Sequence, residues 1–539
     1  MCSRRRPSGE VWFPLPKRQG IGGEGAVKWE EMGVRRIHLS HTRRTAFALL
    51  ALAALLLAGC GSSSAPDTPT ATVTRPVGTA SPGGADATLD WPVFGYDSAR
   101  TSVNPHETAL NASTVGGLHR LWSVPLPNVA DSSPVYLHGV RLPDGSTADI
   151  LYLTTRDGHL VAVNAANGKT LWSVQNKGVR YTTSSPAIDP SRAYVYSYGL
   201  DGTLRKFNAA TGAQVASGGW PIRITTMPGT EKASSPLNIA NGRVYVTTAG
   251  YPGDAPPYQG HVVGASLANG AEQVFNSLCS EKAHVLSEGE CDANQSGIWA
   301  RGGAVVEPGR GDIYVTTGNG DWNGRTDWGD SVLKLSSDGL RILDSYTPTN
   351  QDELDSRDAD LGSAAPGLLP DIPGAQTPHV LIQGGKDGKL RLVNRDDMSG
   401  QGGPGHLGGE LALLDWPGCQ LFTQPVIWRE GATIWMTLAG TCGMVTYQVA
   451  SDGSGRVILK QMWNSSQHVT TPALAGGVLF AATDGAVYAL NPHTGQQLWS
   501  SKSASAGGSI GGIHWESLIV INGRVFIPDE NGKLTAYGL

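Results

Sequence analysis

A short unit of sequence recurs along this chain, most clearly at residues 151–174, 193–216 and 478–501. Each copy starts with a run of β-branched and aromatic residues, passes through Asp-Gly into a second alternating run, and reaches Asn-x-x-x-Gly before a third run. Asp-Gly suits the positive φ angles of a two-residue hairpin turn. The unit therefore predicts a repeated antiparallel meander, which restricts the chain to folds that stack such meanders.

A proline marks the strand that we expect before most copies of the unit. These prolines are Pro134, Pro186, Pro236, Pro366, Pro425 and Pro472. Most intervals between them are about 45 to 60 residues, the length of a four-stranded propeller blade. Proline at the first residue of a strand costs no ladder hydrogen bond, so these strands fit the innermost position in a blade.

Seven units end in an outer strand, near residues 174, 216, 276, 345, 416, 463 and 501. Residues 524–539 supply inner strands of one more unit, and residues 118–126 have the pattern of its missing outer strand. We expect an all-β fold over residues 90–539, an eight-bladed β-propeller of four-stranded antiparallel blades closed by an N-terminal strand. The 71 glycines and 16% charged residues agree with a turn-dense β protein.

Large aromatic residues follow the Asn-x-x-x-Gly turn in several units. Trp172 and Trp499 occupy the same position, and Phe275, Trp416 and Trp463 lie near equivalent ones. We expect these rings to fill the space between blades as core residues, rather than to form a ligand cage.

Ahead of the repeats, an apolar run from Thr45 to Gly59 follows several arginines and ends at Cys60. The run is too short to span a bilayer comfortably. Residues 57–60, Leu-Ala-Gly-Cys, resemble the lipobox of bacterial lipoprotein signals, and this resemblance implies cleavage before Cys60 and acylation of its thiol. A signal anchor, or a buried helix with a chance cysteine, is the alternative.

This reading divides the chain into four parts. Residues 1–31 are a doubtful leader, residues 32–59 the signal peptide, residues 60–89 a flexible Ser/Thr/Pro/Gly tether, and residues 90–539 the propeller. The expected location is extracytoplasmic, with a monomer held at a membrane by its lipid. Because the removed leader is basic, the remaining chain is acidic, which argues against nucleic acid as a partner.

Four cysteines remain after Cys2 and Cys60 are set aside: Cys279, Cys291, Cys419 and Cys442. An even number outside the cytoplasm predicts disulfides. Proximity favours Cys279 with Cys291 and Cys419 with Cys442, although four cysteines allow three connectivities. A zinc site is the competing interpretation, but no CxxC or paired histidine spacing accompanies these cysteines.

Several longer segments resemble the pyrroloquinoline quinone (PQQ) repeats of quinoprotein dehydrogenases. Residues 90–124 resemble the opening segment of that family, residues 313–323 its Thr-Gly-Asn strand end, and residues 384–397 its Lys-x-Gly hairpin. The pattern is closest to the polyvinyl-alcohol dehydrogenase-like branch. The resemblance runs from residue 90 to residue 539 and implies the same propeller fold.

The resemblance also implies a site for PQQ and calcium on the propeller axis. Asn319 matches the calcium-binding asparagine, Trp299 the tryptophan on which the quinone stacks, and Lys386 the basic residue at the quinone oxygens. Asp360 or Asp358 falls where the catalytic base lies, and Asp360 is also a candidate calcium ligand. A flat aromatic ring, a cation and oxygen ligands suit a flat anionic quinone and calcium.

The chain also departs from that pattern. Residues 178–189 lack adjacent cysteines, residues 249–262 offer Asp254 in place of a glutamate, and residues 352–355 lack the usual Asp-x-Trp-Asp. Because calcium affinity depends on charged oxygen ligands, we expect a binding or scaffold module for a protein, peptide or glycan, without a complete cofactor site. A PQQ- and calcium-dependent dehydrogenase that oxidises an alcohol, polyol or sugar is the alternative.

Overall fold

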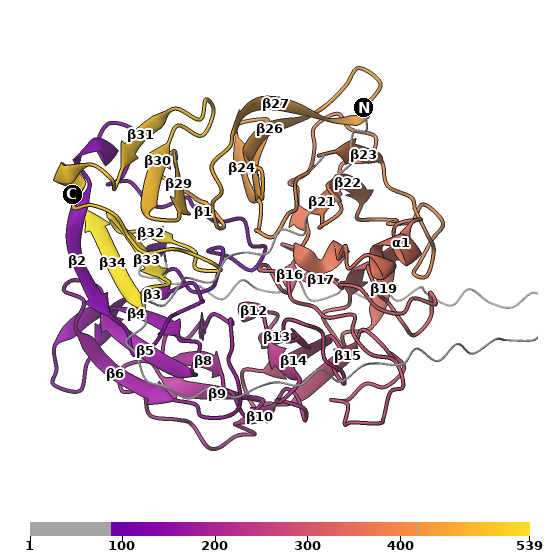
Figure 1. Cartoon of the computed structure of the whole chain (residues 1–539), viewed down its shortest axis with the longest axis horizontal. Helices are drawn as coiled ribbons and strands as arrows, with labels where there is room; N and C mark the ends of the chain where they lie inside the picture. Colours follow the sequence, from indigo (N-terminus) through magenta and orange to yellow (C-terminus); the bar gives the residue numbers. More distant parts are fainter. Residues whose placement is uncertain (1–87, 417) are drawn as a thin grey trace, which may run out of the picture. The chain divides into compact units, whose positions relative to one another are not determined.

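The computed structural model describes residues 88–416 and 418–539. In these residues eight sheets are arranged as blades around a common centre (Figure 1), which confirms the eight-bladed β-propeller. Residues 1–31, the signal peptide at 32–59, Cys60 and nearly all of the tether lie outside the described residues. Within the described part, no helix is long and apolar enough to cross a membrane.

The first four blades use strands that are consecutive in sequence. Blade 1 contains β3 (Val135–Arg141), β4 (Thr147–Thr154), β5 (His159–Asn164) and β6 (Thr170–Gln175). Blade 2 contains β7 (Ala187–Ile188), β8 (Tyr194–Tyr198), β9 (Thr203–Asn208) and β10 (Ile222–Arg223). Blade 3 contains β11 (Glu231–Ala233), β12 (Asn238–Ala240), β13 (Arg243–Gly250), β14 (His261–Ser266) and β15 (Glu272–Asn276). Blade 4 contains β16 (Val305–Val306), β17 (Ile313–Thr316), β18 (Val332–Leu335) and β19 (Ile342–Tyr346).

The last four blades include the two strands that come from the N-terminal side. Blade 5 contains β20 (Gly367–Leu368), β21 (Val380–Gly384), β22 (Lys389–Asn394) and β23 (Ala412–Asp415), after the helix α1 (Gln351–Ser356). Blade 6 contains β24 (Val426–Glu430), β25 (Thr433–Gly440), β26 (Gly443–Ser451) and β27 (Val457–Ser465). Blade 7 contains β28 (Ala473–Ala475), β29 (Val478–Thr483), β30 (Ala486–Leu490), β31 (Gln497–Ser500) and β1 (Val103–Asn104). Blade 8 contains β32 (Ile519–Ile521), β33 (Arg524–Asp529), β34 (Lys533–Gly538) and β2 (His119–Pro125).

The ring is closed by strand exchange between the two ends of the propeller. β2 pairs antiparallel with β34, so the N-terminal side supplies the outer strand of the last blade, as expected. The hydroxyl groups of Ser123 and Thr535 lie 2.9 Å apart across this pair. In a closed ring every blade has a neighbour on both sides. No blade then has an exposed face, as the end blades of an open array would have.

Adjacent blades are joined by a tryptophan on the outer strand. The Nε1–H group of each such tryptophan donates to a backbone carbonyl of the following blade: Trp122 to Ala165, Trp172 to Ala209, Trp463 to Pro492 and Trp499 to Leu118. The repeat glycine makes room for the ring, because a Cβ on Gly212 would lie 2.7 Å from the ring of Trp172. The recurring Gly and Trp of the sequence therefore belong to one contact between blades.

The outer strand of blade 2 begins later than expected. The unit at 193–216 carries Ala216 where the first unit carries Trp172, so no ring holds the chain there. Gly218 and Gly219 then take positive φ angles, and β10 follows at Ile222–Arg223. Trp220 supplies the buried ring instead, and its ring centroid lies 5.1 Å from that of Tyr196.

The segment from Trp91 to Asn104 crosses the inner strands of several blades. Its backbone hydrogen-bonds to Tyr136, Ile188, Val306, Ile427 and Leu474, which lie in blades 1, 2, 4, 6 and 7. Arg100 is fully buried, and its guanidinium donates to the carbonyl oxygens of Phe94, Pro236, Leu237 and Gly302 at 2.6 to 3.2 Å. Burial lowers the pKa of Arg100 to about 9.

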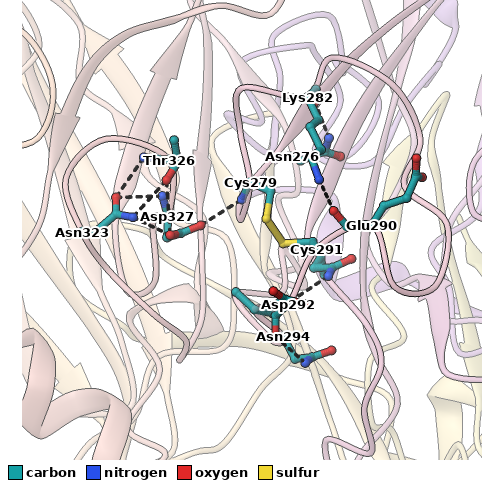
Figure 2. Close-up of a disulfide and its surroundings, with 12 residues drawn as sticks. Asn276, Cys279, Lys282, Glu290, Cys291, Asp292, Asn294, Asn323, Thr326 and Asp327 are labelled. Carbon is teal, nitrogen blue, oxygen red and sulfur yellow. Dashed lines mark hydrogen bonds between the residues drawn. A yellow bond between two sulfur atoms is a disulfide. The ribbon is translucent and has the colours of Figure 1, made fainter.

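Both expected disulfides are present. Cys279 and Cys291 bridge the loop after β15, and Cys419 and Cys442 bridge blade 6 to the segment before it. Figure 2 shows that the carboxylate of Asp327 accepts a hydrogen bond from the backbone N–H of Cys279, at 2.9 Å. Because all four cysteines are paired, the zinc interpretation is wrong.

The contact between Trp172 and blade 2 yields a stability prediction. Trp172→Phe keeps most of the ring but leaves the carbonyl of Ala209 without this donor, so the free energy of unfolding should fall by about 1 kcal/mol. Trp172→Ala also leaves the space between blades unfilled and should cost about 3 to 5 kcal/mol. Urea unfolding measures both, with the exposed Leu413→Ala as a control. Equal midpoints for Trp172→Ala and wild type would contradict the assignment.

Candidate axial binding site

Three aromatic rings meet at the centre of the propeller. Trp299, Phe422 and Trp515 come from the segments before β16, β24 and β32, in blades 4, 6 and 8. Their ring centroids are 6.0 to 6.2 Å apart, and all three side chains are half-buried. Since these blades are not neighbours in the ring, their rings can touch only across the axis. We call these three residues the axial cluster.

One edge of the axial cluster carries an ion pair. Lys386 Nζ lies 5.4 Å from the centroid of the Trp299 ring and contacts the carboxylates of Asp360 and Asp358, the latter at 3.0 Å. The other oxygen of Asp360 accepts a hydrogen bond from the backbone N–H of Asn319 at 2.7 Å. The structure therefore brings together all five residues that the resemblance marked, while their roles stay predictions.

Burial and charge shift the pKa values of this ion pair in opposite directions. Burial raises the pKa of Asp360, and the nearby Lys386 ammonium offsets part of that rise. Burial also lowers the pKa of Lys386, but the carboxylates of Asp360 and Asp358 outweigh it and raise the pKa overall. Lys386 is therefore charged at neutral pH and stays fixed against Asp360.

The carboxylate oxygens of Asp360 and Asp254 are not arranged to bind a calcium ion. Calcium takes six to eight oxygen ligands, several of them from carboxylates. Asp360 already has one oxygen on Lys386 and the other on the Asn319 backbone. Asp254, which replaces the expected glutamate, accepts a hydrogen bond from the hydroxyl of Tyr258 at 2.7 Å. The half-buried rings and Lys386 fit a planar or aromatic group instead, held by stacking and by a cation.

A charged network that the sequence analysis missed lies beside Trp515. Arg156 Nη2 lies 3.0 Å from Asp131 and 2.8 Å from Glu530, and His514 Nδ1 lies 3.1 Å from Asp131. Asp131, His514 and Glu530 are close enough to share a cation, and the Arg156 guanidinium lies among them. The network joins loops of blade 1 to loops of blade 8, where the ring closes.

The sequence contained a weak signal for the position of Trp515. Residues 296–299 read Ser-Gly-Ile-Trp, and residues 511–515 read Gly-Gly-Ile-His-Trp, at equivalent places before the innermost strands of blades 4 and 8. The repetition of Gly-Ile before a tryptophan indicated that Trp515 has a position like that of Trp299.

Glu516 lies beside this network, where its carboxyl group accepts a hydrogen bond from the backbone N–H of His514, and it yields a prediction about pH. Burial first, and then the charges of Asp131 and Glu530, raise the pKa of Glu516 from 4.5 to about 9. Native Glu516 thus keeps its proton between these pH values while the unfolded chain releases it, so stability falls as pH rises through this window. Glu516→Gln cannot lose a proton, so its advantage in the free energy of unfolding over wild type should grow by about 1.4 kcal/mol per pH unit across this window.

Urea unfolding at several pH values measures this difference, and Glu288→Gln, at an exposed position, is the control. If wild type and Glu516→Gln lost stability in parallel as pH rose, Glu516 would not be the protonated group.

Comparison with known proteins agrees with the propeller fold. The family model PQQ_2, described as outer membrane protein assembly factor BamB, matches residues 116–323 and 441–539. Methanol dehydrogenase [cytochrome c] subunit 1 of Methylobacterium organophilum is 29% identical over 122 residues, 21% of this chain and 19% of that protein. The chain thus matches about a fifth of the length of that curated relative.

Solved structures of two dehydrogenases share the fold. The quinohemoprotein alcohol dehydrogenase ADHIIG of Pseudomonas putida HK5 aligns with a TM-score of 0.60 and 14% identity, over 84% of this chain and 80% of that one. A europium-containing methanol dehydrogenase aligns with a TM-score of 0.61 and 13% identity, over 84% of this chain and 98% of that one. At this identity the likeness shows the fold alone. The family model covers more than half of this chain, so the chain belongs to the PQQ_2 family of propeller proteins.

Proposed function

We propose that this protein is a lipid-anchored, extracytoplasmic binding module that holds a partner protein at its axial cluster. The observation that carries the proposal is the meeting of Trp299, Phe422 and Trp515, half-buried, at the centre of the ring. Tryptophan and arginine are among the residues that contribute most to protein–protein binding energy. Lys386 and Arg301 lie against these rings, with Asp358 exposed beside them.

Three further features support this proposal. Both oxygens of Asp360 are occupied, one by Lys386 and the other by the Asn319 backbone, which favours binding over dehydrogenation. The disulfides Cys279–Cys291 and Cys419–Cys442 suit an oxidising compartment. The description of the matching family names an outer membrane protein assembly factor.

A PQQ- and calcium-dependent alcohol dehydrogenase is the second candidate. It is favoured by the gathering of Trp299, Asn319, Asp360 and Lys386, in the order that the resemblance implies. The similar solved structures carry alcohol and methanol dehydrogenase names. This function requires Asp360 to exchange the Lys386 ammonium for a calcium ion.

Photo-crosslinking in intact cells tests the binding proposal. A photoreactive phenylalanine at position 422 of the full-length protein should form one dominant adduct with a partner protein. The same group at Leu413, which is 50% exposed on the outer strand of blade 5, should not form it. Adducts are compared by mass spectrometry.

The anchor is tested in the same cells. Cys60→Ala should move the folded propeller from the membrane to the soluble fraction and reduce the adduct from position 422, because a tether without its acyl chains gives no stable attachment. The same adducts from both positions, or none from position 422, would contradict the binding face.

A further inference from the structure

Two cations lie buried side by side where blades 2, 3 and 4 meet. Lys232 in β11 is 5% exposed, and Arg301, before β16, is 3% exposed. Both bind Thr183: Arg301 Nη1 donates to its carbonyl oxygen at 3.1 Å, and Lys232 Nζ lies 3.4 Å from its hydroxyl group. Lys232 Nζ also donates to the hydroxyl of Ser234 at 2.8 Å.

Neither cation has a carboxylate partner within 4 Å among residues 88–416 and 418–539. Arg100 is also buried without a carboxylate partner, but carbonyl oxygens accept its N–H groups, and three further buried cations do have carboxylate partners. Lys334 lies 3.6 Å from Asp312, Arg391 contacts Asp387 and Arg395 contacts Glu307. An ion taken out of water without a partner costs several kcal/mol in folding free energy, so this pair requires compensation.

Hydrogen-bond donors at the pair are left without acceptors. Arg301 Nε and Nη2 are buried and have no partner among the described residues. Burial and the positive charge of Arg301 lower the pKa of Lys232 to about 8, although the charge of Asp131 opposes them. Burial lowers the pKa of Arg301 to about 10.

Aromatic rings surround both cations. Lys232 Nζ lies 5.5 Å and 5.7 Å from the ring centroids of Tyr181 and Tyr251. The Arg301 guanidinium lies 5.0 Å from the ring of Phe94 and 5.8 Å from that of Trp515. Ring faces attract cations, but they do not satisfy the N–H donors in the plane of a guanidinium.

We propose that Lys232 and Arg301 form a binding site for an oxyanion, the carboxylate or phosphate group of a ligand. The free Nε–H and Nη2–H groups of a guanidinium form the fork that matches two oxygens of one such group. Lys232 supplies a second positive charge and further N–H donors. The anion restores the charge balance that the described residues leave open.

The site adjoins the axial cluster, because Trp515 contacts both Arg301 and Trp299. A ligand could therefore place its acidic group on the two cations and the rest of its body toward the rings. The inference goes beyond the proposed function, since it stands on the buried charges and holds for a binding module or an enzyme.

Calorimetric titration of the full chain tests the proposal with two probes, inorganic phosphate and benzoate, at an ionic strength held with sodium chloride. Wild type should bind at least one probe, and Lys232→Met should weaken that binding at least tenfold. Lys206→Met is the matched control, because Lys206 is half-buried with its ammonium 4.2 Å from the ring centroid of Tyr194, and the part of the chain that the structure describes offers it no carboxylate partner. Lys206→Met should change the affinity for either probe by less than twofold.

Arg301→Gln, which keeps an N–H donor but no charge, should weaken binding in the same way and guards against misfolding of one variant. Thermal unfolding gives a second readout: each probe that binds should raise the Tm of wild type but not that of Lys232→Met. Phosphate binding without benzoate identifies a phosphate ligand, and the reverse identifies a carboxylate. Binding of neither probe to wild type, or equal binding to Lys232→Met, overturns the proposal.

Discussion

The buried guanidinium of Arg100 holds the centre of this propeller together. Its donors reach carbonyl oxygens that are far apart in sequence, from Phe94 to Gly302. Through it, the segment from Trp91 to Asn104 is fixed against the innermost strands, where Figure 1 shows the indigo part of the chain entering the ring. Because one guanidinium donates to four carbonyl oxygens, its loss would leave buried acceptors in blades 3 and 4 and in segment 91–104 at once.

The same arrangement determines what the axis can bind. With segment 91–104 against the inner strands, Phe94 lies under Arg301, and Arg301 lies under Trp515. Rings and cations therefore alternate from the buried segment toward the half-buried axial cluster. Two of the acidic residues near the axis are already paired, Asp360 with Lys386 and Asp131 with Arg156. This leaves a site that is rich in aromatic surface and positive charge, which favours anionic and planar groups over metal ions.

Much of the fold could be predicted because the repeat itself encodes it. Asp-Gly turns, prolines before inner strands and the Gly–Trp contact are local patterns that recur, and the outer strand at 118–126 was recognisable as the missing piece. The outer strand of blade 2 was placed too early because Ala216 replaces the docking tryptophan. The Asp131–His514 network could not be predicted, since its members lie 383 residues apart and meet only where the ring closes.

Reconstitution with PQQ and calcium tests the central claim, that the Asp360–Lys386 pair makes this site a binding site rather than a calcium-dependent redox centre. The purified full-length protein is incubated with both, desalted, and examined for quinone absorbance and for dye reduction with a panel of alcohols, beside an active quinoprotein dehydrogenase. The account predicts no calcium-dependent quinone binding and no dye reduction. One retained quinone per chain, with dye reduction that requires calcium and an alcohol, would contradict it.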